Sequence, residues 1–130
     1  MKEPLWLSAA VILAIHDRLL ADFGGSAGLR DAGLLESALG KPQNLFGYGK
    51  PTLFSLAASY ASGIVRNHPF IDGNKRTGFV AAAAFLDSNG MELMATELDA
   101  TVKTLGLAAN EITEEQYAAW IAANCRRLSH

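Results

Sequence analysis

Apolar residues recur every three or four positions along most of the chain, which is the spacing of helices that bury one face. The pattern is clearest over residues 52–67, where it predicts a long amphipathic helix. It also predicts a first helix over residues 8–23 and a shorter second helix from Asp31 to Gly40. No alternating pattern typical of strands extends over more than a few residues. The sequence therefore predicts an all-α fold of about six helices.

Three further helices are predicted in the second half of the chain. The run FVAAAAFLD, residues 79–87, is apolar on every side, which is typical of a central helix surrounded by others. Residues 96–109 are predicted to form another helix, and a last one runs toward the C-terminus. Residues 41–51 contain several glycines and prolines, which predict a loop or a small hairpin. Suitable N-cap residues precede five of these helices: Ser8, Asp31, Thr52, Thr96 and Thr113, the last with Gln116 in a capping-box pattern.

Composition limits the function classes that the chain can belong to. The 130 residues suffice for one domain, residues 1–130, and a second domain is not expected. Eleven basic residues against thirteen acidic ones leave a net charge of -2, so direct nucleic-acid binding is not expected. The longest apolar stretch is too short to span a bilayer. The early apolar run follows Glu3 and Pro4, which is not typical of a signal peptide. Together with the single cysteine, this favours a cytoplasmic protein without membrane contact.

The most polar stretch of the chain is NHPFIDGNKRTG, residues 67–78, which joins the clearest amphipathic helix to the apolar one. Its second half lies where the apolar helix should begin. Unpaired backbone N–H groups and the positive end of the helix dipole point outward at such a position. Gly73 allows an anion to approach the backbone closely, and Lys75 and Arg76 add two positive charges. The sequence therefore predicts an anion site that suits a polyphosphate.

Two other side chains of this stretch are suited to chemistry on a phosphate. Asp72 is its one carboxylate, and Mg²⁺ prefers one or two carboxylates together with phosphate oxygens and water. A neutral imidazole at His68 could take a proton from an attacking hydroxyl. Each residue alone also has an ordinary structural explanation, as a turn, a helix cap or a surface histidine. The combination in this order is far rarer by chance than any single residue.

The stretch resembles the signature of the Fic/Doc family, which runs His, any, Phe, any, Asp or Glu, Gly, Asn, Gly, Arg, two of any, Arg. Two positions depart from it, because Lys75 stands at the second glycine and Phe79 at the last arginine. Both departures are typical of the Doc branch, the death-on-curing toxins of type II toxin-antitoxin systems. Residues 16–43 also resemble the N-terminal region of that branch. The matching signature positions are His68, Phe70, Asp72, Gly73, Asn74 and Arg76.

The resemblance implies a compact Fic-like bundle of helices with ATP as co-substrate and Mg²⁺ as its metal. Carried over by position, His68 is the catalytic base and Asp72 is the metal ligand. The Doc branch implies a protein kinase that transfers the γ-phosphoryl group to a Thr or Ser hydroxyl of a translation factor. In this family the target is elongation factor Tu, and the result is arrest of translation and growth. The implied phosphate-binding residues are Gly73, Asn74, Lys75 and Arg76.

The alternative reaction is AMP transfer, which most Fic proteins catalyse. An AMP-transferring site must hold the β- and γ-phosphates as the leaving group, and Phe79 stands where one cationic anchor for them would be. The bulky Lys75 replaces a glycine at the bend, so a γ-phosphate near His68 would receive charge stabilisation from Lys75 and Arg76. A noncatalytic module and an RNA-cutting toxin with His68 as base are weaker alternatives.

The resemblance also implies two kinds of protein contact. Residues 41–51 lie where Fic proteins have a flap that holds the target as an added strand, so Phe46 and Tyr48 are candidate flap residues. Many Fic proteins contain an inhibitory Ser/Thr-xxx-Glu-Gly/Asn helix, and the nearest match here, residues 88–92, is broken by Gly90. Control is therefore expected from a separate Phd-like antitoxin, whose flexible C-terminal segment would fold as a helix into an apolar groove.

Overall fold

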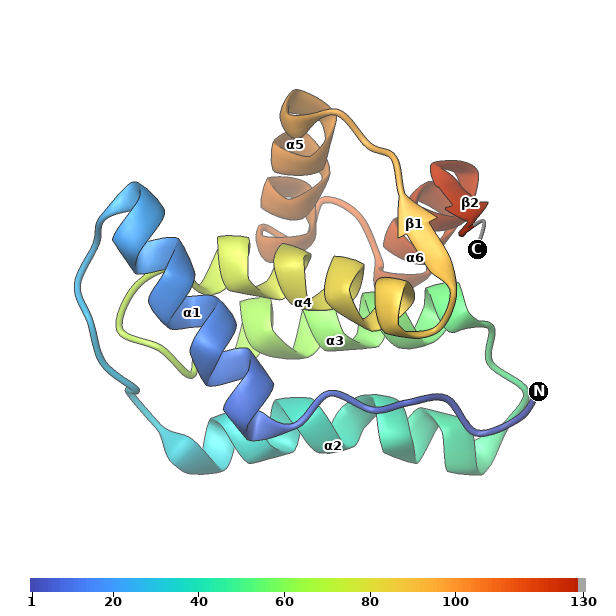
Figure 1. The fold of residues 1–130 in the computed structure, drawn as a ribbon, viewed down its shortest axis with the longest axis horizontal. Coiled ribbons are helices and arrows are strands. Elements are labelled where there is room, and N and C mark those ends of the chain that lie inside the picture. Colours follow the sequence, from blue (N-terminus) through green and yellow to red (C-terminus); the bar gives the residue numbers. More distant parts are fainter. Residues whose placement is uncertain (129–130) are drawn as a thin grey trace.

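The computed structural model describes residues 1–128, which form six helices and two short strands (Figure 1). The predicted all-α fold of about six helices is confirmed. None of the helices in this part of the chain is long and apolar enough to cross a membrane. In chain order the elements are α1 (Ala9–Phe23), α2 (Ala32–Tyr48), α3 (Leu53–Asn67), α4 (Asn74–Ser88), β1 (Met91–Leu93), α5 (Glu97–Ala108), α6 (Glu114–Ala123) and β2 (Cys125–Arg127).

The core is centred on α3, which packs against α2, α4 and α6. Every residue from 56 to 65 is buried, although the sequence pattern predicts a single buried face for this helix. Glycine permits the close packing, because a Cβ on Gly63 would lie 3.1 Å from the backbone of Ala38 in α2. Only part of α4 is buried. The apolar run at 79–87, predicted as the central helix, is therefore less buried than α3.

Side-chain caps begin most of the helices. In five of the six helices of residues 1–128, the N-cap side chain accepts a hydrogen bond from the backbone N–H three residues later. α4 is the exception, because its N-cap is Gly73 and no side chain caps it. The five capping residues are those that the sequence predicts: Ser8, Asp31, Thr52, Thr96 and Thr113.

The loop or hairpin predicted over residues 41–51 is wrong, because α2 continues through Pro42 as far as Tyr48. Proline disfavours a helix interior locally, but the burial of this segment outweighs that preference. The Pro42 side chain is fully buried, and the Phe46 ring packs edge-on against Trp6, with ring centroids 5.7 Å apart. Tertiary packing therefore extends the helix beyond the point where the local sequence favours its end.

Residues 125–127 form a strand where the last helix was predicted to continue. β2 follows α6 and pairs antiparallel with β1, which lies between α4 and α5; each strand has three residues. The side-chain Nδ2 of Asn124 donates to the Trp120 carbonyl at 2.8 Å at the end of α6. Across the strand pair, Arg126 Nε donates to Glu92 Oε1 at 2.8 Å. Strands this short contain too few residues for an alternating pattern to be recognised in the sequence.

Buried polar contacts fix α5 against α6. The hydroxyls of Tyr117 and Thr104 are hydrogen-bonded at 2.8 Å, and burial raises the pKa of Tyr117 to about 12. Trp120 Nε1 donates to Asp99 Oδ2 at 2.7 Å. These contacts set the position of the α5 face that borders the functional site.

Candidate active site

The 67–78 stretch runs from the last residue of α3 to the first turns of α4. His68 ends α3 in the left-handed conformation, with φ 54° and ψ 54°, which is uncommon for residues other than glycine. Its backbone N–H donates to the Ile64 carbonyl at 3.1 Å. The chain turns sharply at this point, and the exposed His68 borders two cavities.

Arg30, in the segment between α1 and α2, holds the backbone around His68. Its Nε donates to the His68 carbonyl at 2.6 Å, and its Nη2 donates to the Asn67 carbonyl at 2.8 Å. The Arg30 backbone N–H also donates to the Pro69 carbonyl at 2.6 Å. The carbonyls of three consecutive residues, 67–69, therefore each accept a hydrogen bond from Arg30, which lies in the N-terminal quarter of the chain.

His16 in α1 contacts the same loop from the other direction. Its side chain is 3% exposed, and its Nε2 donates to the Asp72 carbonyl at 2.8 Å. The His16 ring also stacks on Phe70, with ring centroids 3.8 Å apart. The sequence pattern predicts no role for this histidine. The available signal was its place four residues after Ile12, on the buried face of the first helix.

Asn74, the first residue of α4, ties the loop together from within. Its Oδ1 accepts from the Phe70 N–H at 3.0 Å, and its Nδ2 donates to the Phe70 carbonyl at 2.9 Å. These two bonds fix which end of the amide is Nδ2, which lies 3.2 Å from His68 Nδ1. His68 Nδ1 is therefore the acceptor in this contact, so the proton of the neutral ring is on Nε2. Asn74 was predicted to bind phosphate, but its side chain is turned into the loop.

The start of α4 leaves backbone N–H groups without partners. Gly73 has a φ of 81°, and within the described chain the N–H groups of residues 74–76 form no hydrogen bond. The Asp72 carboxylate does not cap them, because its Oδ1 accepts from the Gly73 N–H at 2.9 Å and its Oδ2 from the Ser26 N–H at 3.2 Å. The partial positive charge of this helix start is therefore available to an anion.

A cavity of about 620 Å³, here called the motif cavity, lies where α1, α4 and α5 meet the 67–78 stretch. The Arg76 guanidinium lies over the Phe23 ring of α1, 4.1 Å from the ring centroid, at an exposed site where such a contact orients the cation. From α5, Glu97 and Thr101 contribute to the wall. The motif cavity brings together all the signature residues that were predicted to act there: His68, Asp72, Gly73, Asn74, Lys75 and Arg76.

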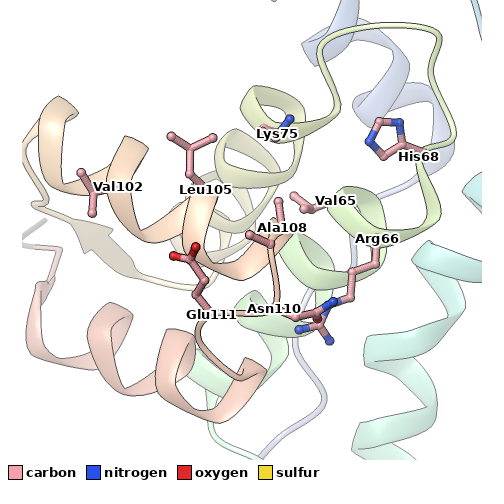
Figure 2. A pocket seen from close by; sticks show the side chains of 11 residues that line it. Val65, Arg66, His68, Lys75, Val102, Leu105, Ala108, Asn110 and Glu111 are labelled. Atoms are coloured by element: carbon pink, nitrogen blue, oxygen red, sulfur yellow. The ribbon is translucent and has the colours of Figure 1, made fainter.

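A second cavity, of about 760 Å³, lies between the end of α3 and the C-terminal half of α5 (Figure 2). His68, Lys75 and Leu105 line both cavities, so these three side chains mark the boundary between them. The second cavity is lined on one side by Val65 and Arg66 of α3, and on the other by residues of α5 and of the α5–α6 turn. Nothing in the sequence pattern predicted this cavity.

The candidate flap residues lie away from the site. Phe46 and Tyr48 are close to the C-terminal end of α2, which Figure 1 shows at the opposite end of the molecule from the loop between α3 and α4. Tyr48 is 91% exposed, and neither residue lines either cavity. By contrast, Phe79 does line the motif cavity, and its ring packs against Trp120 at a centroid distance of 6.3 Å. An aromatic wall therefore stands where the Fic signature has its last arginine.

The acidic side chains fit Mg²⁺ only together with a phosphate ligand. Residues 1–128 contain no group of three or more His, Cys, Asp or Glu side chains that could hold a metal ion by themselves. Asp72 and Glu97 line the motif cavity, and each Asp72 oxygen accepts only one backbone N–H. One carboxylate with phosphate oxygens and waters is a donor set that Mg²⁺ favours. The arrangement is therefore compatible with a metal bound along with a nucleotide.

The fold and the site together define a helical protein in which a histidine, a carboxylate and an uncapped helix start border one cavity. A family model described as "Fic/DOC family" matches residues 6–86. The chain is 34% identical over 123 residues to "Protein kinase doc" of Escherichia phage P1, and the match covers 94% of each protein. It is 44% identical over 75 residues to "Toxin Doc" of Mycolicibacterium smegmatis, covering 56% of this chain and 58% of that protein. The chain belongs to the Fic/DOC family, which confirms the resemblance found in the sequence.

Proposed function

We propose that this protein is a Doc-like toxin that transfers the γ-phosphoryl group of ATP to a Ser or Thr hydroxyl of a translation factor. The observation that supports this most directly is that His68 and Lys75 line the same cavity as the uncapped start of α4. Family membership supports a Fic-type transfer reaction. The names of the two relatives support the toxin and kinase parts of the proposal.

The phosphate groups of ATP bind at the start of α4 in this proposal. The free N–H groups of residues 74–76 and the side chains of Lys75 and Arg76 supply hydrogen bonds and positive charge. Phe79 provides an apolar surface at the position where an AMP-transferring site has a cationic anchor for its leaving group. The triphosphate is therefore expected to place its terminal phosphate beside Lys75 and His68.

His68 acts as the general base that takes the proton of the attacking hydroxyl. In the structure, the ring nitrogen without a proton is Nδ1, and its lone pair already accepts a hydrogen bond from the Asn74 amide. The hydroxyl therefore has to displace this amide, or the ring has to turn over and exchange tautomers. Asn74 keeps the ring in place through its own bonds to Phe70, so we assign it a positioning role.

Asp72 is the residue that would hold Mg²⁺, and the bound ion would neutralise charge that develops on the phosphate oxygens. Its backbone contributes separately, because the Asp72 carbonyl accepts the hydrogen bond from His16. This contact limits movement of the loop while the carboxylate is engaged. The requirement for Mg²⁺ can be tested by adding a chelator to the transfer assay.

Elongation factor Tu, the target that the family resemblance implies, is the proposed substrate in the bacterial cytoplasm. Control by a Phd-like antitoxin fits the apolar side chains that remain exposed around the motif cavity. Phe23 of α1 and Ile71 of the loop line this cavity and are more than half exposed. A segment that folds as a helix over them would cover the start of α4, so antitoxin binding and ATP binding are expected to exclude each other.

One labelling assay separates the candidate reactions. Bacterial lysate is incubated with the protein and with ATP labelled at either the α- or the γ-phosphate. We expect γ-label on one protein, and loss of that label with His68→Ala by roughly 10²-fold or more. Tyr48→Ala serves as the matched control, because Tyr48 is exposed and lines neither cavity.

Each other outcome points to a different conclusion. Transfer of the α-label alone indicates AMP transfer, and transfer of neither label indicates a noncatalytic module or an RNA-cutting toxin. Undiminished γ-label transfer by His68→Ala would show that another group is the base.

A further inference from the structure

We infer that the second cavity is the binding site for the segment of the protein substrate that presents the accepting hydroxyl. This inference rests on the proposed phosphoryl transfer and adds where and how the substrate binds. The cavity lies beside His68, outside the motif cavity to which the nucleotide is assigned (Figure 2). Its occupant has to be a chain segment with both apolar and charged side chains.

The position of the second cavity follows from the geometry that group transfer requires. The attacking oxygen and the leaving oxygen lie on opposite sides of the transferred phosphorus, so the two substrates must meet at the base from different directions. Asp72, Gly73 and Arg76 line the motif cavity and do not line the second one. Apart from Lys75, which lines both cavities, the anion-binding groups are thus on one side, and the second cavity is the space left on the other side of His68 and Lys75.

The walls of the second cavity determine what kind of segment fits. Val102 and Leu105 of α5 are 55% and 49% exposed, and they form an apolar wall that an apolar side chain of the substrate can cover. Arg66 and Glu111 also line the cavity, and neither forms an ion pair with any residue between 1 and 128. In Figure 2 the Arg66 side chain extends toward the turn that contains Asn110 and Glu111. The expected segment therefore has an apolar residue near its Ser or Thr, with an acidic side chain for Arg66 and a basic one for Glu111.

Residues 41–51 are the other place where the substrate was expected to bind, and the course of α2 carries them away from the site. The flap was expected over residues 41–51, but these residues belong mainly to α2 and lead away from the loop between α3 and α4 (Figure 1). They line neither cavity. A substrate segment that reaches His68 needs contacts close to it, and α5 with the α5–α6 turn provides them.

α5 offers a matched pair of substitutions that tests the inference. Val102 lines the second cavity, whereas Leu98, one turn earlier, is 76% exposed and lines neither cavity. We expect Val102→Asp to lower γ-label transfer to the substrate by about tenfold or more, which corresponds to about 1.4 kcal/mol of lost binding. Leu98→Asp is expected to transfer label like the wild type. Both variants should bind Mg²⁺-ATP like the wild type in calorimetry and keep its melting temperature.

Charge reversal adds an independent measurement. Glu111→Lys should lower labelling of the substrate and leave binding of Mg²⁺-ATP unchanged, because Glu111 is assigned to the protein segment alone. If Val102→Asp or Glu111→Lys instead weakened ATP binding, the cavity would hold part of the nucleotide and the inference would be overturned.

Different results would contradict the assignment of the second cavity and the proposed function. If the wild type transfers γ-label and both Val102→Asp and Glu111→Lys match it, only the assignment of the second cavity is wrong. If the wild type transfers no γ-label to any protein, the proposed function is wrong, and the substrate assignment that rests on it is wrong as well.

Discussion

The starts of α4 and α6 differ in how their first backbone N–H groups are bonded: side chains cap those of α6 but not those of α4. At α6, Thr113 Oγ1 accepts from the Gln116 N–H at 3.0 Å and Gln116 Oε1 accepts from the Thr113 N–H at 2.8 Å. At α4 the N-cap is Gly73, and no side chain accepts a hydrogen bond from the first N–H groups. Side-chain caps thus stabilise the start of α6, whereas the bonds of Asn74 to Phe70 and the tertiary contact of His16 with the Asp72 carbonyl hold the uncapped start of α4 in place. The difference indicates that α4 gives up local stability at the position where an anion is proposed to bind.

The largest effect on activity is expected from a carboxylate at the N-cap position of α4. Gly73→Asp places a negative charge at the proposed phosphate site, so γ-label transfer should fall by about 10²-fold or more. Tripolyphosphate should raise the melting temperature of the wild type, because a ligand that binds the folded state stabilises it. It should not raise that of Gly73→Asp.

Gly73→Asn is the control for backbone strain at this position. Both Asp and Asn tolerate the left-handed backbone comparatively well, and each is expected to cost about 1 kcal/mol of stability at a φ of 81°. Gly73→Asn should keep most of the stabilisation by tripolyphosphate. If both variants lost the stabilisation by tripolyphosphate equally, the geometry of the substituted position, and not the negative charge, would be what prevents anion binding.

The next largest effect is expected at His16, because tertiary contacts replace the missing cap. His16→Ala removes the hydrogen bond to the Asp72 carbonyl and the stacking on Phe70. The free energy of unfolding should fall by about 2–3 kcal/mol, and transfer should slow by roughly tenfold as the loop loosens. His16→Gln retains a hydrogen-bond donor but loses the stacked ring. Relative to His16→Ala, its transfer rate should therefore return closer to the wild-type value than its free energy of unfolding does. Urea denaturation and the transfer assay measure the two effects separately.

A smaller effect is expected from the contact that orients Arg76. Phe23→Leu removes the ring that lies under the guanidinium, and an exposed cation–π contact contributes about 0.5–1 kcal/mol. The KM for ATP should therefore rise about two- to fivefold, with little change in kcat. A fall in kcat at constant KM would assign Phe23 to the reacting geometry instead.

The sequence predicts those parts of the molecule that depend on local contacts. Caps such as Thr52 lie next to the N–H groups that they bind, and the whole signature lies within twelve positions, so both could be recognised directly. The extension of α2 through Pro42 could not, because burial against distant residues outweighs the local preference. His16 and the Asp72 carbonyl are 56 positions apart. The second cavity likewise forms only when α5 meets the end of α3.

The smallest effect on activity is expected from a substitution at the start of α6. Thr113→Ala removes the cap of α6 and should lower the free energy of unfolding by about 1 kcal/mol. The α6 start lines neither cavity, so transfer of γ-label and stabilisation by tripolyphosphate should both match the wild type. Urea denaturation followed by circular dichroism measures the first effect, and the labelling assay measures the second. A loss of activity as large as that of His16→Ala would mean that the start of α6 also positions the site, and the distinction between a structural and a functional helix start would not hold.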